Sequence, residues 1–254
     1  MSSNVDRRPF QEVAAETGLG EVVGRYRPAV GADVAIVVVV AFLGIMLIAA
    51  GGDAGAVVGA GVVVLALGAL AAWVTWRKAG RWRYLYPGGS LTTDRTGAVT
   101  SLFTWHDVAH LRIWVRVVNL VSAYAEVPQC RVELRSGEVV DLAKPRYQDT
   151  PALIAYVEKS VAAAILPVKV DEAVRTGAAT FGPLTLTGDG VRRGEQFVAW
   201  SAVTNVEAGK THLKLWTDAR RPALAERLRN IPDVAVLLHL MQHWPVAEEP
   251  DVPA

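Results

Sequence analysis

The sequence has a single cysteine, Cys130, among its 254 residues. An intramolecular disulfide needs a pair of cysteines, and structural zinc or iron–sulfur sites are built from several, so all of these are excluded. A charge excess of either sign is also lacking: 26 Lys and Arg residues balance 25 Asp and Glu residues, leaving a formal net charge of +1. No global field therefore argues for a nucleic-acid partner. Hydrophobic residues make up 52% of the chain, which excludes disorder over most of its length.

The motifs of common enzymes are missing as well. The sequence contains no Gly-x-Ser-x-Gly elbow and no Gly-Lys-Ser/Thr phosphate loop. His106 and His110 have the i,i+4 spacing of zinc ligands on a helix, and His239 and His243 share it without the Glu of the zincin pattern. Cys130 lies on the apolar side of a strand-like alternation, where a free cysteine ordinarily acts as a small hydrophobe. We expect no catalytic residues, no metal site and no cofactor.

Two long apolar runs are present near the N-terminus. The first extends from Val34 to Ala50, and the second, from Ala54 to Trp76, is broken only by Thr75. As helices they would measure about 26 Å and about 35 Å, which brackets the ~30 Å hydrocarbon core of a bilayer. Only Gly51-Gly52-Asp53 separates them, so they predict a transmembrane helical hairpin over residues 30–78. A buried hairpin of a soluble protein is the alternative, but neither run has a polar stripe.

Basic residues flank this hairpin at one end only, at Arg25, Arg27, Arg77, Lys78, Arg81 and Arg83. The positive-inside rule counts Lys and Arg close to the spans, so both termini are expected in the cytoplasm. Tyr26, Trp73, Trp76, Trp82 and Tyr84 gather at the same end, where amphipathic rings prefer the headgroup level. The pattern predicts a protein of the cell membrane with two spans.

Small residues line the second run. Gly55, Gly59 and Gly61 permit close approach of another helix. We expect them to pack within the hairpin, because the tethered partner is already adjacent; dimerisation between molecules is the alternative.

Beyond the hairpin the hydrophobic pattern changes to a period of two, and one order of elements occurs twice. Residues 79–166 contain strand-like segments at 111–118, 130–135 and 138–142, then an amphipathic helix at Pro151 with Thr150 as its N-cap. Residues 167–244 contain strands at 180–187, 196–200, 203–207 and 211–216, then a helix opened by Asn230-Ile231-Pro232-Asp233. Trp-x-x-Val at 105–108 and again at 200–203 is the clearest shared anchor. Residues 1–29 are expected to be a partly disordered cytoplasmic segment, and residues 245–254 a disordered tail.

A small β-sheet or barrel closed by one C-terminal helix resembles a pleckstrin-homology (PH)-like unit. The chain is similar to an uncharacterised actinobacterial family of membrane proteins with a two-helix hairpin and tandem bacterial PH-like domains. The segments that carry the similarity are Gly20-Glu21-Val22-Val23, Tyr26-Arg27-Pro28, Leu85-Tyr86-Pro87-Gly88-Gly89, Trp105-x-Asp107-Val108, Phe181-Gly182-Pro183-Leu184 and Asn230-Ile231-Pro232. The resemblance implies a membrane α-hairpin plus an α+β part, made of two PH-like units that are each closed by a C-terminal helix. It implies no activity.

Basic side chains form the candidate binding surface. Arg112, Trp114 and Arg116 share one strand face, Lys210 and Lys214 share another around His212, and Lys144 and Arg146 form a basic loop. A cytoplasmic leaflet contributes about 1 kcal/mol per nearby Lys or Arg, so anionic lipid headgroups or a protein partner are the expected ligands. A solvated strand face that resists edge aggregation is the alternative.

These features predict a membrane-anchored, non-enzymatic binding or scaffolding protein. Two alternatives remain: a structural or oligomerising subunit of an envelope complex, and an unrecognised membrane enzyme, whose pocket would hold an acid or base with a strongly shifted pKa.

Overall fold

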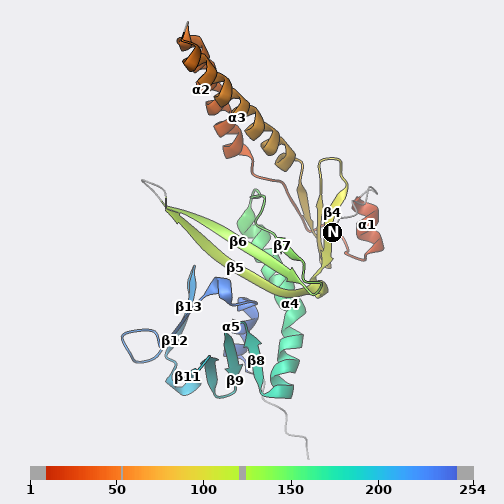
Figure 1. Cartoon of the computed structure of the whole chain (residues 1–254). Helices are drawn as coiled ribbons and strands as arrows, with labels where there is room; N and C mark the ends of the chain where they lie inside the picture. The colour runs from red at the N-terminus through yellow and green to blue at the C-terminus, as the bar shows by residue number, and fades with distance from the viewer. Residues whose placement is uncertain (1–9, 53, 120–123, 245–254) are drawn as a thin grey trace, which may run out of the picture. The chain divides into compact units, whose positions relative to one another are not determined.

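The computed structural model describes residues 10–52, 54–119 and 124–244 (Figure 1). The chain forms two compact bodies. The N-terminal body comprises Met1–Thr104 and Lys144–Thr150, and the C-terminal body comprises Trp105–Ala143 and Pro151–Ala254. The predicted disordered tail and the first nine residues lie outside the described residues.

Two antiparallel helices, α2 (Gly31–Gly51) and α3 (Gly55–Ala79), form the predicted hairpin (Figure 1). Both are long and apolar enough to cross a membrane. The span Asp33–Gly51 has a mean hydropathy of 3.0 and the span Gly55–Ala79 one of 2.4, and only 11% of the residues in the apolar stretch of each are buried. The helices therefore contact each other along a narrow seam and expose apolar side chains elsewhere.

Glycines of α3 differ in what they face. A Cβ on Gly61 would lie 2.6 Å from Ile48 Cγ1 of α2, so Gly61 packs within the hairpin as predicted. Gly55 and Gly59 do not, because a Cβ there would meet nothing within 4 Å. Successive residues of a helix are about 100° apart, so Gly59 lies on nearly the opposite side of α3 from Gly61.

The hairpin is inserted into an antiparallel sheet of the N-terminal body. Strand β1 (Gly24–Tyr26) precedes α2 and pairs with β2 (Trp82–Leu85), which follows α3; Gly24 lies opposite Leu85. Strands β3 (Gly89–Thr93) and β4 (Val99–Thr104) complete the order β1-β2-β3-β4. The short helix α1 (Phe10–Glu16) packs on this sheet, where the rings of Phe10 and Tyr84 stack with their centres 4.5 Å apart. The segment before the hairpin thus holds a helix and a strand.

The C-terminal body begins with a long β-ribbon. Strands β5 (Val108–Asn119), β6 (Tyr124–Leu134) and β7 (Val139–Asp141) form one antiparallel sheet. The helix α4 (Thr150–Thr176) follows. Thr150 is the first residue of this helix and not the residue before it, as the predicted N-cap would be, and its hydroxyl donates to the Tyr147 carbonyl at 2.7 Å. The helix continues past Pro167, and the boundary predicted between residues 166 and 167 therefore falls inside it.

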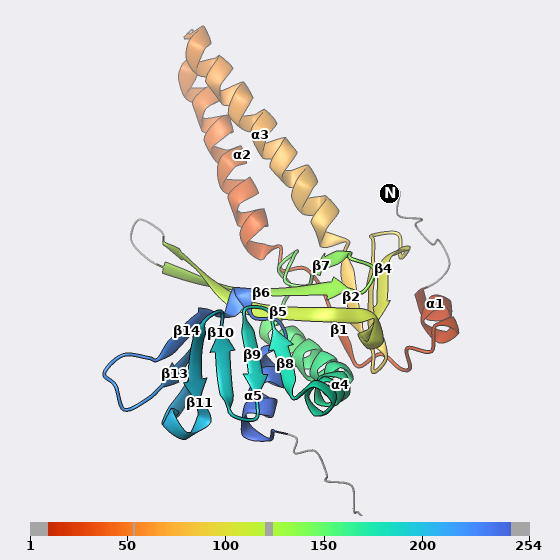
Figure 2. The same ribbon diagram turned by 60° about the horizontal axis from the view of Figure 1, so that its bottom comes forward.

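A second set of strands completes this body (Figure 2). It contains β8 (Ala178–Phe181), β9 (Leu184–Thr187), β10 (Gly190–Arg193) and β11 (Gln196–Ala199) in one sheet. A second sheet holds β12 (Asn205–Ala208), β13 (His212–Trp216) and β14 (Leu224–Arg227), and α5 (Val234–Gln242) ends the set. The strand predicted over 180–187 is two strands, because Gly182 turns the chain with φ +60°. Strand β14 was not predicted.

The two sets repeat the same order. In each, four antiparallel strands lead into a short 3-10 helix that begins at the anchor tryptophan, at Trp105–Asp107 and at Trp200–Ala202. Three antiparallel strands and a helix follow. The internal repeat inferred from Trp-x-x-Val is therefore present in the element order. The first connection differs: a tight turn joins β8 to β9, whereas the whole hairpin joins β1 to β2.

Candidate functional site

The strand face that carries Arg112, Trp114 and Arg116 is arranged as the alternation predicted. Arg112 lies opposite Arg131 of β6, and Trp114 opposite Gln129. The other face of the ribbon is buried at Leu111, Cys130 and Val132. The burial of Cys130 agrees with its reading as a small core residue.

Three of the predicted contact residues are neutralised by carboxylates. Arg112 Nη1 donates to Glu133 Oε2 at 2.8 Å, and this hydrogen bond holds the pKa of the Glu133 carboxyl below its usual range. Lys210 Nζ lies 2.9 Å from Glu126 Oε2, and that contact raises the pKa of Lys210. Lys214 Nζ lies 3.4 Å from Glu207 Oε1. An anion that bound these three residues would have to compete with carboxylates already in place.

Arg116 and Trp114 line a different feature, which we call the basic groove. This groove of about 540 Å³ lies within the C-terminal body, and its lining residues are Trp114, Val115, Arg116, Thr211, His212, Arg227 and Arg229. No carboxylate is among them. Arg227 and Arg229 were not among the predicted contact residues, because the sequence analysis did not identify β14 as a strand. The alternation of Leu224, Glu226 and Leu228 with Ala225 and Arg227 was the signal that could have revealed that strand.

Lys144 and Arg146 belong to the N-terminal body, whereas the other predicted contact residues belong to the C-terminal body. The Ala29 N–H donates to the Arg146 carbonyl at 2.6 Å, and the Gln148 N–H donates to the Arg27 carbonyl at 2.9 Å. This pairing holds the basic loop beside the start of α2. The basic loop and the bases of α2 and α3 line a cavity of about 770 Å³, which we call the foot pocket. Its lining residues are Ala29, Val30, Gly31, Asp33, Lys78 and Lys144–Asp149.

Arginines cover tryptophan rings at the same end of the hairpin. The Arg25 guanidinium lies 4.0 Å from the centre of the Trp82 ring, and the Arg95 guanidinium lies at the same distance from Trp76. Arg77 lies 4.7 Å from Trp73. Lys78 Nζ and Asp33 Oδ2, 3.8 Å apart, join the bases of α3 and α2. Positive charge and aromatic surface are thus combined where the apolar spans end.

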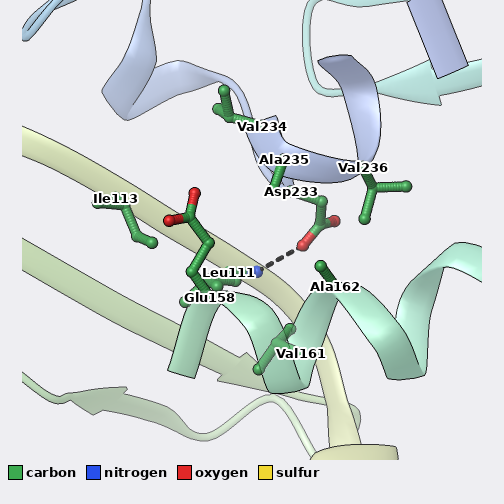
Figure 3. Close-up of a pocket in the computed structure, with 9 residues that line it drawn as sticks. All are labelled: Leu111, Ile113, Glu158, Val161, Ala162, Asp233, Val234, Ala235 and Val236. Carbon is green, nitrogen blue, oxygen red and sulfur yellow. Dashed lines mark hydrogen bonds between the residues drawn. The ribbon is translucent and has the colours of Figure 1, made fainter. Parts of the chain in front are cut away.

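Two carboxylates meet near β5 in the C-terminal body, and Figure 3 shows them without a hydrogen bond between them. The buried Asp233 carboxylate accepts from the Leu111 N–H at 2.8 Å and lies 3.1 Å from His110 Nδ1. Glu158 stands among apolar side chains, and burial raises its pKa. This is the shifted acid that an enzyme would need, but the cavity beside it measures about 10 Å³. Such a space holds about one water molecule and no organic substrate.

The histidine pairs lack the geometry of a helical zinc site. His106 belongs to the 3-10 helix Trp105–Asp107 and His110 to β5, so they do not share a helix. His239 stacks on His243 with ring centres 4.9 Å apart. Within residues 10–52, 54–119 and 124–244, no group of three or more His, Cys, Asp or Glu side chains could hold a metal ion.

Comparison with known proteins adds one finding. The model of a family of unknown function, DUF6585, matches residues 2–250. No curated protein matches the chain. No solved structure matches it either. Like the uncharacterised family that the sequence resembles, this family has no assigned function. The actinobacterial origin and the PH-like fold remain expectations.

Proposed function

The chain belongs to the DUF6585 family, whose function is unknown, and we propose that it is a membrane-anchored, non-enzymatic binding or scaffolding protein. Its hairpin spans the cell membrane twice, and both termini lie in the cytoplasm. The two strand-and-helix sets are PH-like units at the cytoplasmic face, and the foot pocket contacts anionic lipid headgroups.

The exposure of the hairpin carries this proposal. Large apolar side chains point outward along α2 and α3, among them Ile36, Phe42 and Leu67 at 59%, 61% and 58% exposure. A soluble protein rarely leaves a continuous apolar surface of this extent in water. Helices that are apolar on all sides are covered either by protein or by lipid. Because only 11% of the residues in the apolar stretch of each span are buried by their own chain, lipid is the covering we assign.

The foot pocket supports contact with headgroups. The backbone hydrogen bonds of Arg146 and Gln148 hold the loop that carries Lys144 and Arg146 beside the residues that lead into α2. If α2 spans the bilayer, these charges lie at the depth of the phosphate groups. The guanidinium–tryptophan pairs at the ends of the spans fit the same depth, since both groups favour the interface.

The repeated order of strands and helix supports the PH-like reading. Four strands, three strands and a closing helix occur twice. PH-like folds carry many functions, so the binding role rests on the charged surfaces and not on the fold.

Cysteine labelling of the full chain in intact cells tests the topology. Cys130 is fully buried and can be replaced by Ala, after which Ala54→Cys marks the hairpin turn and Arg220→Cys marks the C-terminal body. We expect a membrane-impermeant maleimide to label residue 54 in intact cells and residue 220 only after permeabilisation. Labelling of both, or release of the protein from membranes by alkaline carbonate, would contradict the proposal.

Bound lipid tests the foot pocket. We expect the full chain purified from nanodiscs with phosphatidylglycerol to retain several-fold less of this lipid when it carries Lys144→Gln and Arg146→Gln. The matched control is Arg220→Gln with Arg221→Gln, which removes the same charge from an exposed segment of the C-terminal body. Equal retention by both double variants would exclude the foot pocket as a headgroup site.

An oligomerising subunit is the second candidate function. Gly55 and Gly59 form a small-residue face on α3 that α2 leaves open. In a bilayer, such a face permits close approach of a helix from another molecule.

A further inference from the structure

We propose that the basic groove of the C-terminal body is a binding site for a phosphoryl group, carried by a small phosphorylated metabolite or by a lipid headgroup. This site is separate from the foot pocket and does not depend on it. Its contact residues are Arg116, Arg227, Arg229, His212, Thr211 and Trp114.

The three arginines of this groove carry charge that no carboxylate of the described residues neutralises. In the part of the chain that the structure describes, Arg116, Arg227 and Arg229 form no ion pair with a carboxylate. Three other cations on or next to these strands are paired: Arg112 with Glu133, Lys210 with Glu126, and Lys214 with Glu207. The positive field of the three arginines is therefore available to a ligand.

Glu226, which precedes Arg227 in the sequence, already binds other residues on the opposite face of β14. Glu226 is buried, whereas Arg227 is exposed, as the alternation of a strand requires. Glu226 Oε2 lies 2.8 Å from Arg193 Nε, and Glu226 Oε1 accepts from Asn230 Nδ2 at 2.7 Å. It cannot turn to neutralise Arg227 without breaking both contacts.

The walls of the groove are held by backbone hydrogen bonds. His212 of β13 lies opposite Arg227 of β14. The Leu228 N–H donates to the Thr211 carbonyl at 2.9 Å, just before Arg229. Across the groove, the Val115 N–H donates to the Lys210 carbonyl at 3.2 Å, which fixes β5 with Trp114 and Arg116 beside β13. The backbone that carries the binding groups is thus fixed before any ligand arrives, which lowers the ordering cost of binding.

The residue types point to phosphate. Guanidinium groups bind phosphate oxygens through paired hydrogen bonds, and several together suit a group with more than one negative charge. The Thr211 hydroxyl and His212 Nδ1 lie 2.9 Å apart, and the remaining hydrogen-bonding capacity of both groups is available to a ligand. The half-buried Trp114 ring offers a flat apolar surface for the remainder of the ligand. The volume, about 540 Å³, lies in the range of small-molecule sites.

Calorimetric titration of the full chain in nanodiscs of zwitterionic lipid tests the site, with pyrophosphate as the first probe. We expect saturable binding that weakens as salt is added. Arg227→Gln with Arg229→Gln should reduce the affinity roughly tenfold or more, since two charge-assisted contacts are lost. The control Arg220→Gln with Arg221→Gln should change it less than about twofold. Near-ultraviolet circular dichroism establishes that both variants are folded.

Dihexanoyl phosphatidic acid, the second probe, separates the two sources of the phosphoryl group. Tighter binding of this lipid than of pyrophosphate, weakened by Trp114→Leu, assigns the groove to a headgroup. Tighter binding of pyrophosphate assigns it to a soluble phosphorylated compound. Failure of the folded wild-type chain to bind either probe, or equal affinities in the Arg227/Arg229 variant and the control, would overturn the proposal. Neither failure would alter the cysteine-labelling result, so the membrane topology is tested separately.

Discussion

The two strand-and-helix sets differ most at their first connection. In the second set, Gly182 and Pro183 take the chain directly from β8 to β9. In the first set, the chain leaves β1, passes through α2 and α3, and returns at β2 in register with the strand it left. A strand connection at the edge of a sheet accepts an inserted segment when the ends of that segment lie close together, as those of an antiparallel hairpin do. The apolar hairpin is therefore attached to one sheet by both of its ends, whereas the second set has no comparable insertion between its first two strands.

The largest effect is expected at the tight turn of the second set. Gly182 has φ +60°, and a Cβ there would lie 2.5 Å from the Asn230 carbonyl oxygen. Gly182→Ala should destabilise the protein by about 3 kcal/mol, through backbone strain and this clash. Gly194→Ala is the control, because its φ is +56° and nothing lies within 4 Å of the added Cβ. Gly194→Ala should lower the free energy of unfolding, measured by chemical denaturation, by about 1 kcal/mol. Equal losses would show that the contact with Asn230 has no energetic weight.

An intermediate effect is expected within the hairpin of the first set. Gly61→Leu places a side chain where Ile48 of α2 already lies, and we expect a loss of about 2 kcal/mol through overpacking. Gly59→Leu should leave the thermal unfolding of the detergent-solubilised chain unchanged, because this position faces away from α2. If Gly59→Leu instead changes the sedimentation of the particle, the open face of α3 contacts a second molecule. Equal destabilisation by both variants would contradict the assigned seam.

The smallest effect concerns the closing helix α4. Burial raises the pKa of Glu158, so the folded state binds a proton more tightly than the unfolded state does. Stability should therefore fall as the pH rises from 4.5, the ordinary pKa of a glutamate side chain, through the raised folded-state pKa. Glu158→Gln should stabilise the protein by about 1 kcal/mol or less near neutral pH. This gain should vanish in acid. Thermal unfolding across this pH range measures it, and a gain that grew toward low pH would contradict the assignment.

Local patterns were sufficient for much of the fold. The apolar runs at 34–50 and 54–76 predicted the hairpin, since a helix that long and that apolar has few alternatives. Alternation along residues 111–118 predicted which side of β5 is buried, and the repeated Trp-x-x-Val marked the start of both 3-10 helices. The pairing of β1 with β2 across the hairpin was not accessible, because a strand as short as Gly24–Tyr26 carries too few residues for a periodic signal.

The sequence predicted which residue types form the candidate site, but not how these residues are arranged. Basic residues on β5, β13 and the loop at Lys144 and Arg146 were found as residue types. Which of them face carboxylates depends on partners that are distant in sequence, such as Glu126 for Lys210. The same is true of the basic groove, whose walls come from β5, β13 and the segment that begins with β14.

The sequence alone determined the presence of two spanning-length apolar helices, the polarity of their flanks and the order of the repeated elements, because hydropathy and periodicity are local properties. Only the tertiary structure decided which glycine lies in the hairpin seam, which cations remain unpaired, and where Lys144 and Arg146 are held. Those properties depend on distances between residues far apart in the chain, and such distances are set by strand register and packing.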